Sequence, residues 1–305
     1  MTYNISLKKV CTTLYLVLSI FLLQSCSSDG PDTAKYPAVP NGIDKNFCAN
    51  DGRLYGHTVV VIDKTSTLNQ GQLDFMASHV FGEKFYGSYQ PFTKFSYILV
   101  DSTKPTSQKY VWSACRPKKG VATKYSIKNN NNDELNSNDE NKILVESTWN
   151  NFISDSLIIK NKILKPKNST SKNSLIYETI IEALNRPDLD FGDDYPLRNL
   201  VVVSDLMQSS DRVNFYRECK TNKNLASPNI CPKFKTIEKN LVTEEYIRNT
   251  TPKDSINDID IQIVYVNNRY ETKASLDETL LDLWTSYFEK YGFRSPEIKR
   301  MVDLK

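Results

Sequence analysis

Short apolar runs alternate along the chain with longer segments whose apolar residues recur at helical spacing. The runs are nearly all apolar and rich in β-branched residues, which is typical of strands buried on both faces of a sheet. They are HTVVVID (57–63), KFSYILVD (94–101), RNLVVVSD (198–205) and IDIQIVYVNN (259–268), with KYVWSAC (109–115) as a further candidate strand.

Four segments carry apolar residues at the spacing of an amphipathic helix. They are residues 68–85, 142–164, 173–185 and 275–293. Because strands and helices alternate and the strands are apolar throughout, we expect a mostly parallel sheet covered on both faces. The predicted fold class is therefore α/β, doubly wound, with a five- or six-stranded sheet, in one domain over residues 55–298.

The N-terminus has the pattern of a secretory signal. Lys8 and Lys9 precede an apolar stretch at residues 10–23, which is too short for a comfortable membrane span. We therefore expect residues 1–25 to be a signal peptide. An uncleaved signal anchor and a plain secreted protein are the alternatives.

The end of this stretch carries a candidate lipidation site. Leu-Gln-Ser-Cys at residues 23–26 resembles a bacterial lipobox, which implies that Cys26 becomes the lipidated first residue. The residue after Cys26 is Ser27 and not aspartate. In this respect the chain resembles the lipoproteins that enteric-type bacteria send to the outer membrane. Residues 26–54 are polar at their start and predict a flexible tether. The expected location is the bacterial cell envelope, lipid-anchored at the outer membrane and facing the periplasm.

Four cysteines remain beyond Cys26, and in an oxidising compartment they can pair in three ways. Cys219 and Cys231 lie within one polar insert, residues 206–250, so a local disulfide is the simplest pairing. That choice leaves Cys48 with Cys115. Zinc is the rival use, but the chain has only 2 histidines and no Cys-x-x-Cys pair. A second polar segment, residues 126–142, predicts a loop.

The charge balance argues against nucleic acid as the partner. The chain is 39% hydrophobic and 25% charged, as ordinary globular proteins are, and its net charge is +3. Without the two lysines of the signal the net charge falls to +1. We therefore expect no basic surface for nucleic acid.

Asp63 and Asp205 each end a predicted strand, at the edge where such sheets bind ligands. Asp63 is followed by Lys-Thr-Ser-Thr, and Asp205 ends the run at 198–205. A strand that ends in Asp-x-Thr-x-Thr places the oxygens of Asp63, Thr65 and Thr67 around one point. Because Mg²⁺ takes six oxygen ligands, we expect Mg²⁺ there, or else Mn²⁺ or Ca²⁺. The alternative is that both acids only hold loops at strand ends.

The same stretch is close to the phosphorylated-aspartate motif of P-type ATPases, Asp-Lys-Thr-Gly-Thr-Leu-Thr. The chain lacks the series of long apolar spans that ion transport requires. The acidic pair at 193–194 lies in FGDDYP, which reads as a turn, and no glycine-rich phosphate loop is present. A phosphoaspartate-type enzyme is the least favoured function, so we expect no enzymatic activity and assign no catalytic residue.

Three pieces of sequence, in this order, resemble a von Willebrand factor A-type (VWA) domain. DKTST at 63–67 is similar to the family's Asp-x-Ser-x-Ser, with threonine in place of both serines. NSLIYETI at 173–180 is similar to its Thr-x-Leu-x-x-Ala-Leu, with Ser174 in the role of the threonine. VSD at 203–205 matches the acid after its fourth strand, with Leu206 where the family often has glycine. The resemblance spans about residues 55–293.

The resemblance implies a metal-ion-dependent adhesion site that binds a protein partner. The cation would be completed by an acidic side chain of the partner, which Lys64 would help to attract. The implied ligands are Thr65 and Thr67 directly, Asp63 and Asp205 largely through water, and Ser174 directly or through water. The expected function is protein binding in the cell envelope. The alternative is a metal-free structural subunit of an envelope assembly, such as a secretion or conjugation machine.

Overall fold

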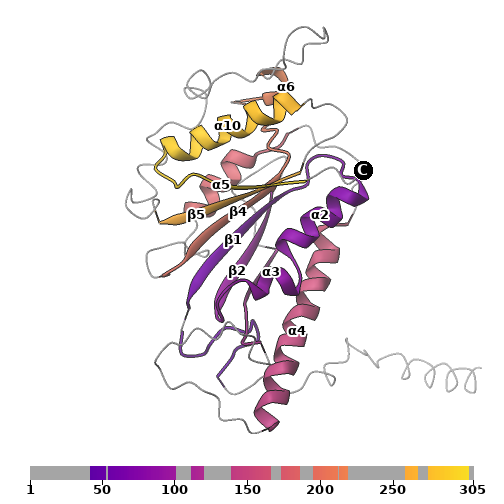
Figure 1. The fold of residues 1–305 in the computed structure, drawn as a ribbon, viewed down its shortest axis with the longest axis vertical. Helices are drawn as coiled ribbons and strands as arrows, with labels where there is room; N and C mark the ends of the chain where they lie inside the picture. Colours follow the sequence, from indigo (N-terminus) through magenta and orange to yellow (C-terminus); the bar gives the residue numbers. More distant parts are fainter. Residues whose placement is uncertain are drawn as a thin grey trace, which may run out of the picture. The chain divides into compact units, whose positions relative to one another are not determined.

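The computed structural model describes residues 42–52, 54–100, 111–119, 139–165, 173–185, 195–211, 213–218, 258–266 and 274–301. Within them the chain forms a six-stranded sheet with helices on both faces (Figure 1). β3 is antiparallel to β2, and all other neighbouring strands are parallel. The α/β, doubly wound, mostly parallel fold is thereby confirmed. In sheet order the strands are β3 (Trp112–Cys115), β2 (Thr93–Val100), β1 (Gly56–Asp63), β4 (Arg198–Ser204), β5 (Ile259–Tyr265) and β6 (Glu297–Arg300).

The edge strand β6 was not predicted. Its sequence is EIKR, and its four residues are exposed or only half-buried, so no apolar run marks it. It forms because its backbone pairs with β5 from Gln262 to Tyr265. Charged residues on an edge strand also discourage pairing with a further strand.

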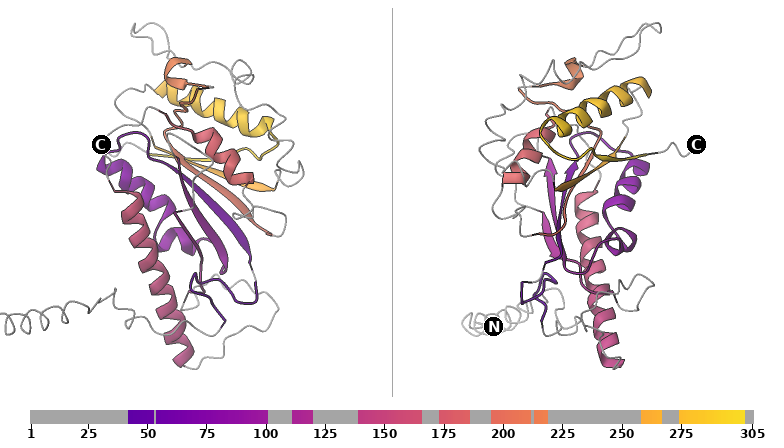
Figure 2. Two further views of the ribbon diagram at one scale, coloured as in Figure 1. Left: turned by 180° about the vertical axis from the view of Figure 1, so that it is seen from behind. Right: turned by 60° about the vertical axis from the view of Figure 1, so that its left-hand side comes forward.

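The helices divide between the two faces of the sheet (Figures 1 and 2). α2, α3 and α4 cover one face, whereas α5 and α10 cover the other. The one helix predicted over 68–85 is two helices, because the chain turns at Gly82 with φ +88°. The helices are α2 (Gln70–Val80), α3 (Glu83–Gly87), α4 (Asp139–Ile163), α5 (Ile176–Asn185), α6 (Phe215–Glu218) and α10 (Ala274–Lys290).

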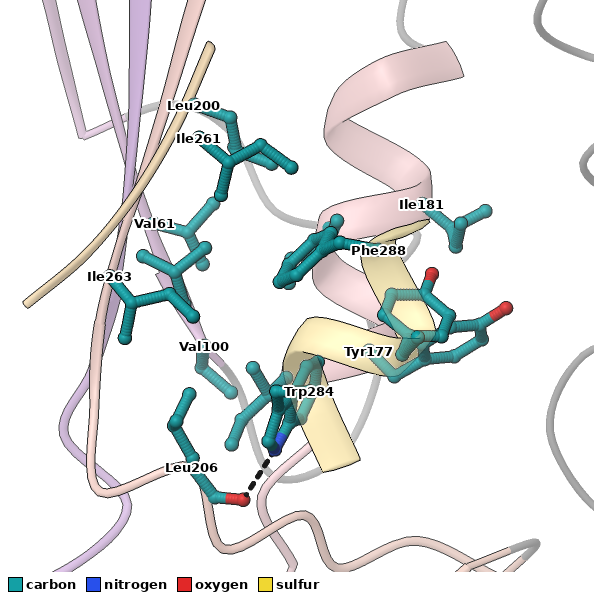
Figure 3. Close-up of a cluster of buried hydrophobic side chains, with 14 of the residues drawn as sticks. Val61, Val100, Tyr177, Ile181, Leu200, Leu206, Ile261, Ile263, Trp284 and Phe288 are labelled. Carbon is teal, nitrogen blue, oxygen red and sulfur yellow. Dashed lines mark hydrogen bonds between the residues drawn. The ribbon is translucent and has the colours of Figure 1, made fainter. Parts of the chain in front are cut away.

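The four strands β1, β2, β4 and β5 supply side chains to both cores. On β1, Val59 and Val61 pack under α5 and α10, whereas Val60 and Ile62 pack under α2 and α4. All four are at most 1% exposed, which explains why the run is apolar throughout rather than alternating. Figure 3 shows the core beneath α5 and α10, where Trp284 and Phe288 meet the strands.

The segment 42–52 packs against the domain, although it was predicted to lie in the tether. Phe47 is buried and stacks edge-on against Phe152 of α4 at 5.6 Å. A disulfide joins Cys48 to Cys115 at the end of β3. This is the pairing that the sequence left for these two cysteines once Cys219 and Cys231 were paired with each other. The domain thus begins by Gly42 rather than at residue 55. Cys26, Cys219 and Cys231 lie outside the described residues.

No helix within the described part of the chain is both long enough and apolar enough to cross a membrane.

Candidate metal-binding site

The candidate site lies where the strand order reverses. β1 and β4 are adjacent and parallel, and the chain runs from β1 to one side of the sheet and from β4 to the other. In doubly wound sheets this switch point opens a crevice at the carboxyl ends of the strands. Asp63 is the last residue of β1, and Asp205 follows Ser204, the last residue of β4. The two predicted acids are therefore neighbours at the position where such folds bind ligands.

Asp63 accepts four hydrogen bonds from three segments of the chain. Its Oδ1 accepts from the backbone N–H of Thr65 at 2.9 Å and from Thr65 Oγ1 at 2.6 Å. Its Oδ2 accepts from Ser174 Oγ at 3.0 Å and from Ser204 Oγ at 2.8 Å. Ser174 and Ser204 lie 111 and 141 residues away in the sequence. The carboxylate of Asp63 thus joins the three pieces of the predicted pattern.

Asp205 is held next to this group by separate donors. Its Oδ2 accepts from Ser66 Oγ at 3.0 Å, and its Oδ1 accepts from the backbone N–H of Met207 at 3.0 Å. Burial raises the pKa of Asp205 to about 7, and the charge of Asp63 adds to the rise. The hydrogen bonds from Met207 and Ser66 oppose it. The site therefore concentrates negative charge that its own neighbours do not neutralise.

The loop after β4 takes its shape from Leu206, the second residue after the end of that strand. Leu206 has φ +61°, in the left-handed region, yet its side chain is fully buried. Its N–H donates to Ser204 Oγ at 2.8 Å, and its carbonyl accepts from Trp284 Nε1 of α10 at 3.0 Å (Figure 3). A leucine in this conformation costs about 1–2 kcal/mol. Core packing and these two hydrogen bonds hold it there.

The helix start that carries Ser174 is fixed to the same loop. Ser174 and Ser209 exchange backbone hydrogen bonds of 2.8 and 2.9 Å. Gln208 accepts from the backbone N–H of Tyr177 at 3.0 Å and donates to Glu178 at 2.8 Å, which satisfies the first turn of α5. The loop after β4 thus sets where Ser174 stands relative to Asp63.

Thr67 differs from the other predicted ligands. It is exposed and takes no part in the hydrogen bonds to Asp63 or Asp205. Ser66 and Ser204 take that part instead, although neither was among the predicted ligands. Both are hydroxyl residues directly beside a predicted ligand, and that adjacency was the only signal available for them.

Lys64 does not point toward an incoming ligand, contrary to expectation. Its ammonium donates to the backbone carbonyl of Ile163 and, at 2.7 Å, to that of Lys165. Ile163 is the last residue of α4 and Lys165 follows it by two residues, so the ammonium lies at the C-terminus of the helix, where a positive charge is favourable because of the helix dipole. Lys64 therefore ties the loop after β1 to the end of α4.

The donor set fits a small hard cation. It consists of two carboxylates and the hydroxyls of Thr65, Ser66, Ser174 and Ser204, all of them oxygen donors as Mg²⁺ prefers. Three or more clustered His, Cys, Asp or Glu side chains occur nowhere in the described ranges. A cation there would thus be bound by the two aspartates, by neutral hydroxyls and by water.

The sequence matches no protein-family model and no curated protein.

Proposed function

We propose that this protein is a lipoprotein of the bacterial cell envelope whose VWA-like domain binds a partner protein through a divalent cation. Asp63, Thr65, Ser174 and Asp205 would hold the cation, with Thr67 at the exposed rim. When bound, the cation would supply an open coordination position for a carboxylate of the partner. The chain's own residues orient the ligands and keep them fixed.

One observation carries this proposal. Residues from the ends of β1 and β4 and from the start of α5 converge through the carboxylate of Asp63. Burial and, second to it, the charge of Asp63 raise the pKa of Asp205, so its charged form is unfavourable without a positive charge nearby. A divalent cation would supply that charge. The convergence of these residues at the switch point supports a binding role over a purely structural one.

The chain enters the folded domain at the end of the sheet opposite the candidate site. The segment 42–52 is bound to Cys115, which pairs with Lys94 near the start of β2. Asp63 ends β1 at the other end of the strands. Eight residues of strand span about 26 Å. The candidate site therefore lies about one strand length from the disulfide that anchors this segment.

A metal titration tests the site. We expect Mg²⁺ or Mn²⁺ to raise the melting temperature of the chelator-treated protein, since a ligand at 100 times its Kd stabilises by about 2.7 kcal/mol. Asp63→Asn should abolish the shift. Asp282→Asn, which changes an exposed acid on α10, should retain it. An equal shift in the Asp63 variant would place the cation elsewhere, and no shift in the wild type would remove the metal from the proposal.

Two cell experiments test the location and the partner. Cys26→Ser should prevent incorporation of labelled palmitate and release the protein from the membrane fraction. Capture of envelope proteins on the wild type should depend on the divalent cation and be lost with Asp63→Asn. Capture that survives a chelator would argue against a cation between the two proteins.

The second candidate is a metal-free structural subunit of an envelope assembly. It is favoured by the four hydrogen bonds to Asp63, which satisfy this carboxylate without a cation. In that case Asp63→Asn would destabilise the protein, and Mg²⁺ would change neither its stability nor its assembly. A phosphoaspartate enzyme would instead form a fluoroberyllate adduct on Asp63, and we expect none.

A further inference from the structure

A second polar site lies at the other end of the sheet, around Arg116. This residue directly follows β3 and the disulfide-bonded Cys115. Its backbone N–H donates to the carbonyl of Thr93 at 2.9 Å, and its carbonyl accepts from the N–H of Phe92 at 2.7 Å. Arg116 is therefore fixed beside the start of β2.

The guanidinium of Arg116 is buried without a carboxylate partner. The residue is 6% exposed. Nε donates to the carbonyl of Tyr86 at 2.9 Å, and Nη1 donates to that of Pro117 at 3.3 Å. None of the ion pairs among the described residues involves Arg116. Its contacts are thus neutral, although a buried charge is costly unless it is paired.

An aromatic ring and a second cation complete the cluster. The guanidinium carbon lies 5.2 Å from the centroid of the Trp149 ring on α4, and Lys119 Nζ lies 5.6 Å from the same centroid. Lys119 also pairs with Glu83 at 2.5 Å. Arg116 and Lys119 therefore both contact the Trp149 ring, and Glu83 pairs with Lys119. The positive charge of Arg116 is left without a counter-charge.

We propose that Arg116, Lys119 and Trp149 form a binding site for a phosphate group, supplied by the headgroup of an anionic membrane lipid. A guanidinium offers two parallel N–H donors to a phosphate, and an ammonium offers a further point charge. The anion supplies the counter-charge that the chain itself does not provide. Trp149 is buried at 4% exposure, and its ring holds the two cations close to each other.

The position of the cluster favours the lipid over free phosphate as the source. Arg116 is adjacent to Cys115, and Cys115 holds the segment by which the chain would reach a lipidated Cys26. The chain would therefore lead toward that lipid from the end of the sheet at which Arg116 lies. The lipid source rests on the proposed envelope location, whereas the anion site rests only on the contacts of Arg116.

The test compares two phosphate sources on the full chain in neutral detergent micelles. Inorganic phosphate is one probe, short-chain phosphatidylglycerol added to the micelles is the other, and sodium chloride at equal ionic strength is the control. Calorimetry measures affinity, and thermal unfolding measures stabilisation. The variants are Arg116→Gln and Lys119→Gln. Arg294→Gln, which alters an exposed arginine paired with Asp260, is the matched control.

We expect both probes to bind the wild type and the Arg294 variant alike. Affinity should fall at least tenfold in Arg116→Gln and by a smaller factor in Lys119→Gln. Without phosphate, Arg116→Gln should melt no lower than the wild type, because it removes a buried, unpaired charge. If Arg116→Gln fails to fold, the lower affinity of Lys119→Gln still tests the site.

Three outcomes would overturn the proposal in whole or in part. Binding of neither probe to the wild type overturns the site. Equal affinity in the wild type and in both site variants also overturns it. Binding of inorganic phosphate but not of the lipid supports the site and overturns the lipid as its source. The metal titration at Asp63 is independent of all three, so failure of one proposal leaves the other standing.

Discussion

The buried carboxylate of Asp205 should make the stability of the metal-free protein depend on pH. Burial and the charge of Asp63 raise its pKa from 3.8 to about 7. In the unfolded chain this carboxyl loses its proton near pH 4, whereas the folded, metal-free protein keeps it until about pH 7. Between these values the folded state binds more protons, so the stability of the metal-free protein should fall as pH rises.

The size of the effect follows from the shift. Each pKa unit corresponds to about 1.36 kcal/mol, so the rise at Asp205 corresponds to about 4 kcal/mol of stability lost by pH 8.5. Asp205→Asn removes the charge but keeps the shape. Its amide oxygen can still accept from the Met207 N–H, and its NH₂ can donate to Ser66 Oγ, so both hydrogen bonds have replacements.

The assay is urea unfolding of both proteins from pH 5 to pH 8.5 in a chelator. We expect the difference in stability, in favour of the variant, to grow by about 3 kcal/mol between pH 5 and pH 8.5, because part of the loss has already occurred at pH 5. Groups remote from Asp205 titrate equally in both proteins, so the difference between the curves reports on Asp205 together with its neighbour Asp63. Added Mg²⁺ should stabilise the wild type at pH 8.5 and narrow the gap. Curves that stay parallel over this range would refute the reasoning.

Three further changes are predicted to affect stability. Lys64→Met should cost about 1–2 kcal/mol in urea unfolding because it removes both hydrogen bonds to the end of α4, whereas Lys162→Met, at an exposed position of that helix, should be near neutral. Leu206→Gly relieves about 1–2 kcal/mol of backbone strain but loses about 2–5 kcal/mol of buried side chain, so net destabilisation is expected; a more stable glycine variant would mean that strain outweighs packing. Replacing Cys48 and Cys115 by serine opens a loop of 67 residues and should cost about 4 kcal/mol, and reducing agent should then no longer change the melting temperature.

Much of the fold could be predicted from local patterns. The strands β1, β2, β4 and β5 were predicted because each is buried on both faces, and such a strand appears in the sequence as a run of consecutive apolar residues. The helices were predicted because one apolar face recurs at helical spacing. β6 could not be predicted in this way, since its stability comes from pairing with β5 and not from its own side chains.

Some residues of the candidate site could likewise be predicted from local sequence, and others could not. The sequence placed Asp63 and Asp205 at strand ends, because an acid that ends an apolar run is visible locally. It could not show that Ser204, rather than Thr67, bonds to Asp63, since that depends on how β4 lies beside β1.

The sequence by itself determined the four buried strands β1, β2, β4 and β5 and the acids Asp63 and Asp205 at their ends, since both follow from the order of apolar and polar residues along short segments. The tertiary structure alone decided that the side chain of Lys64 binds carbonyls at the end of α4 and that Leu206 adopts a left-handed conformation. It also brought Arg116 and Trp149 together without a carboxylate for the arginine. These features depend on contacts between segments far apart in the chain, and such contacts leave no local pattern.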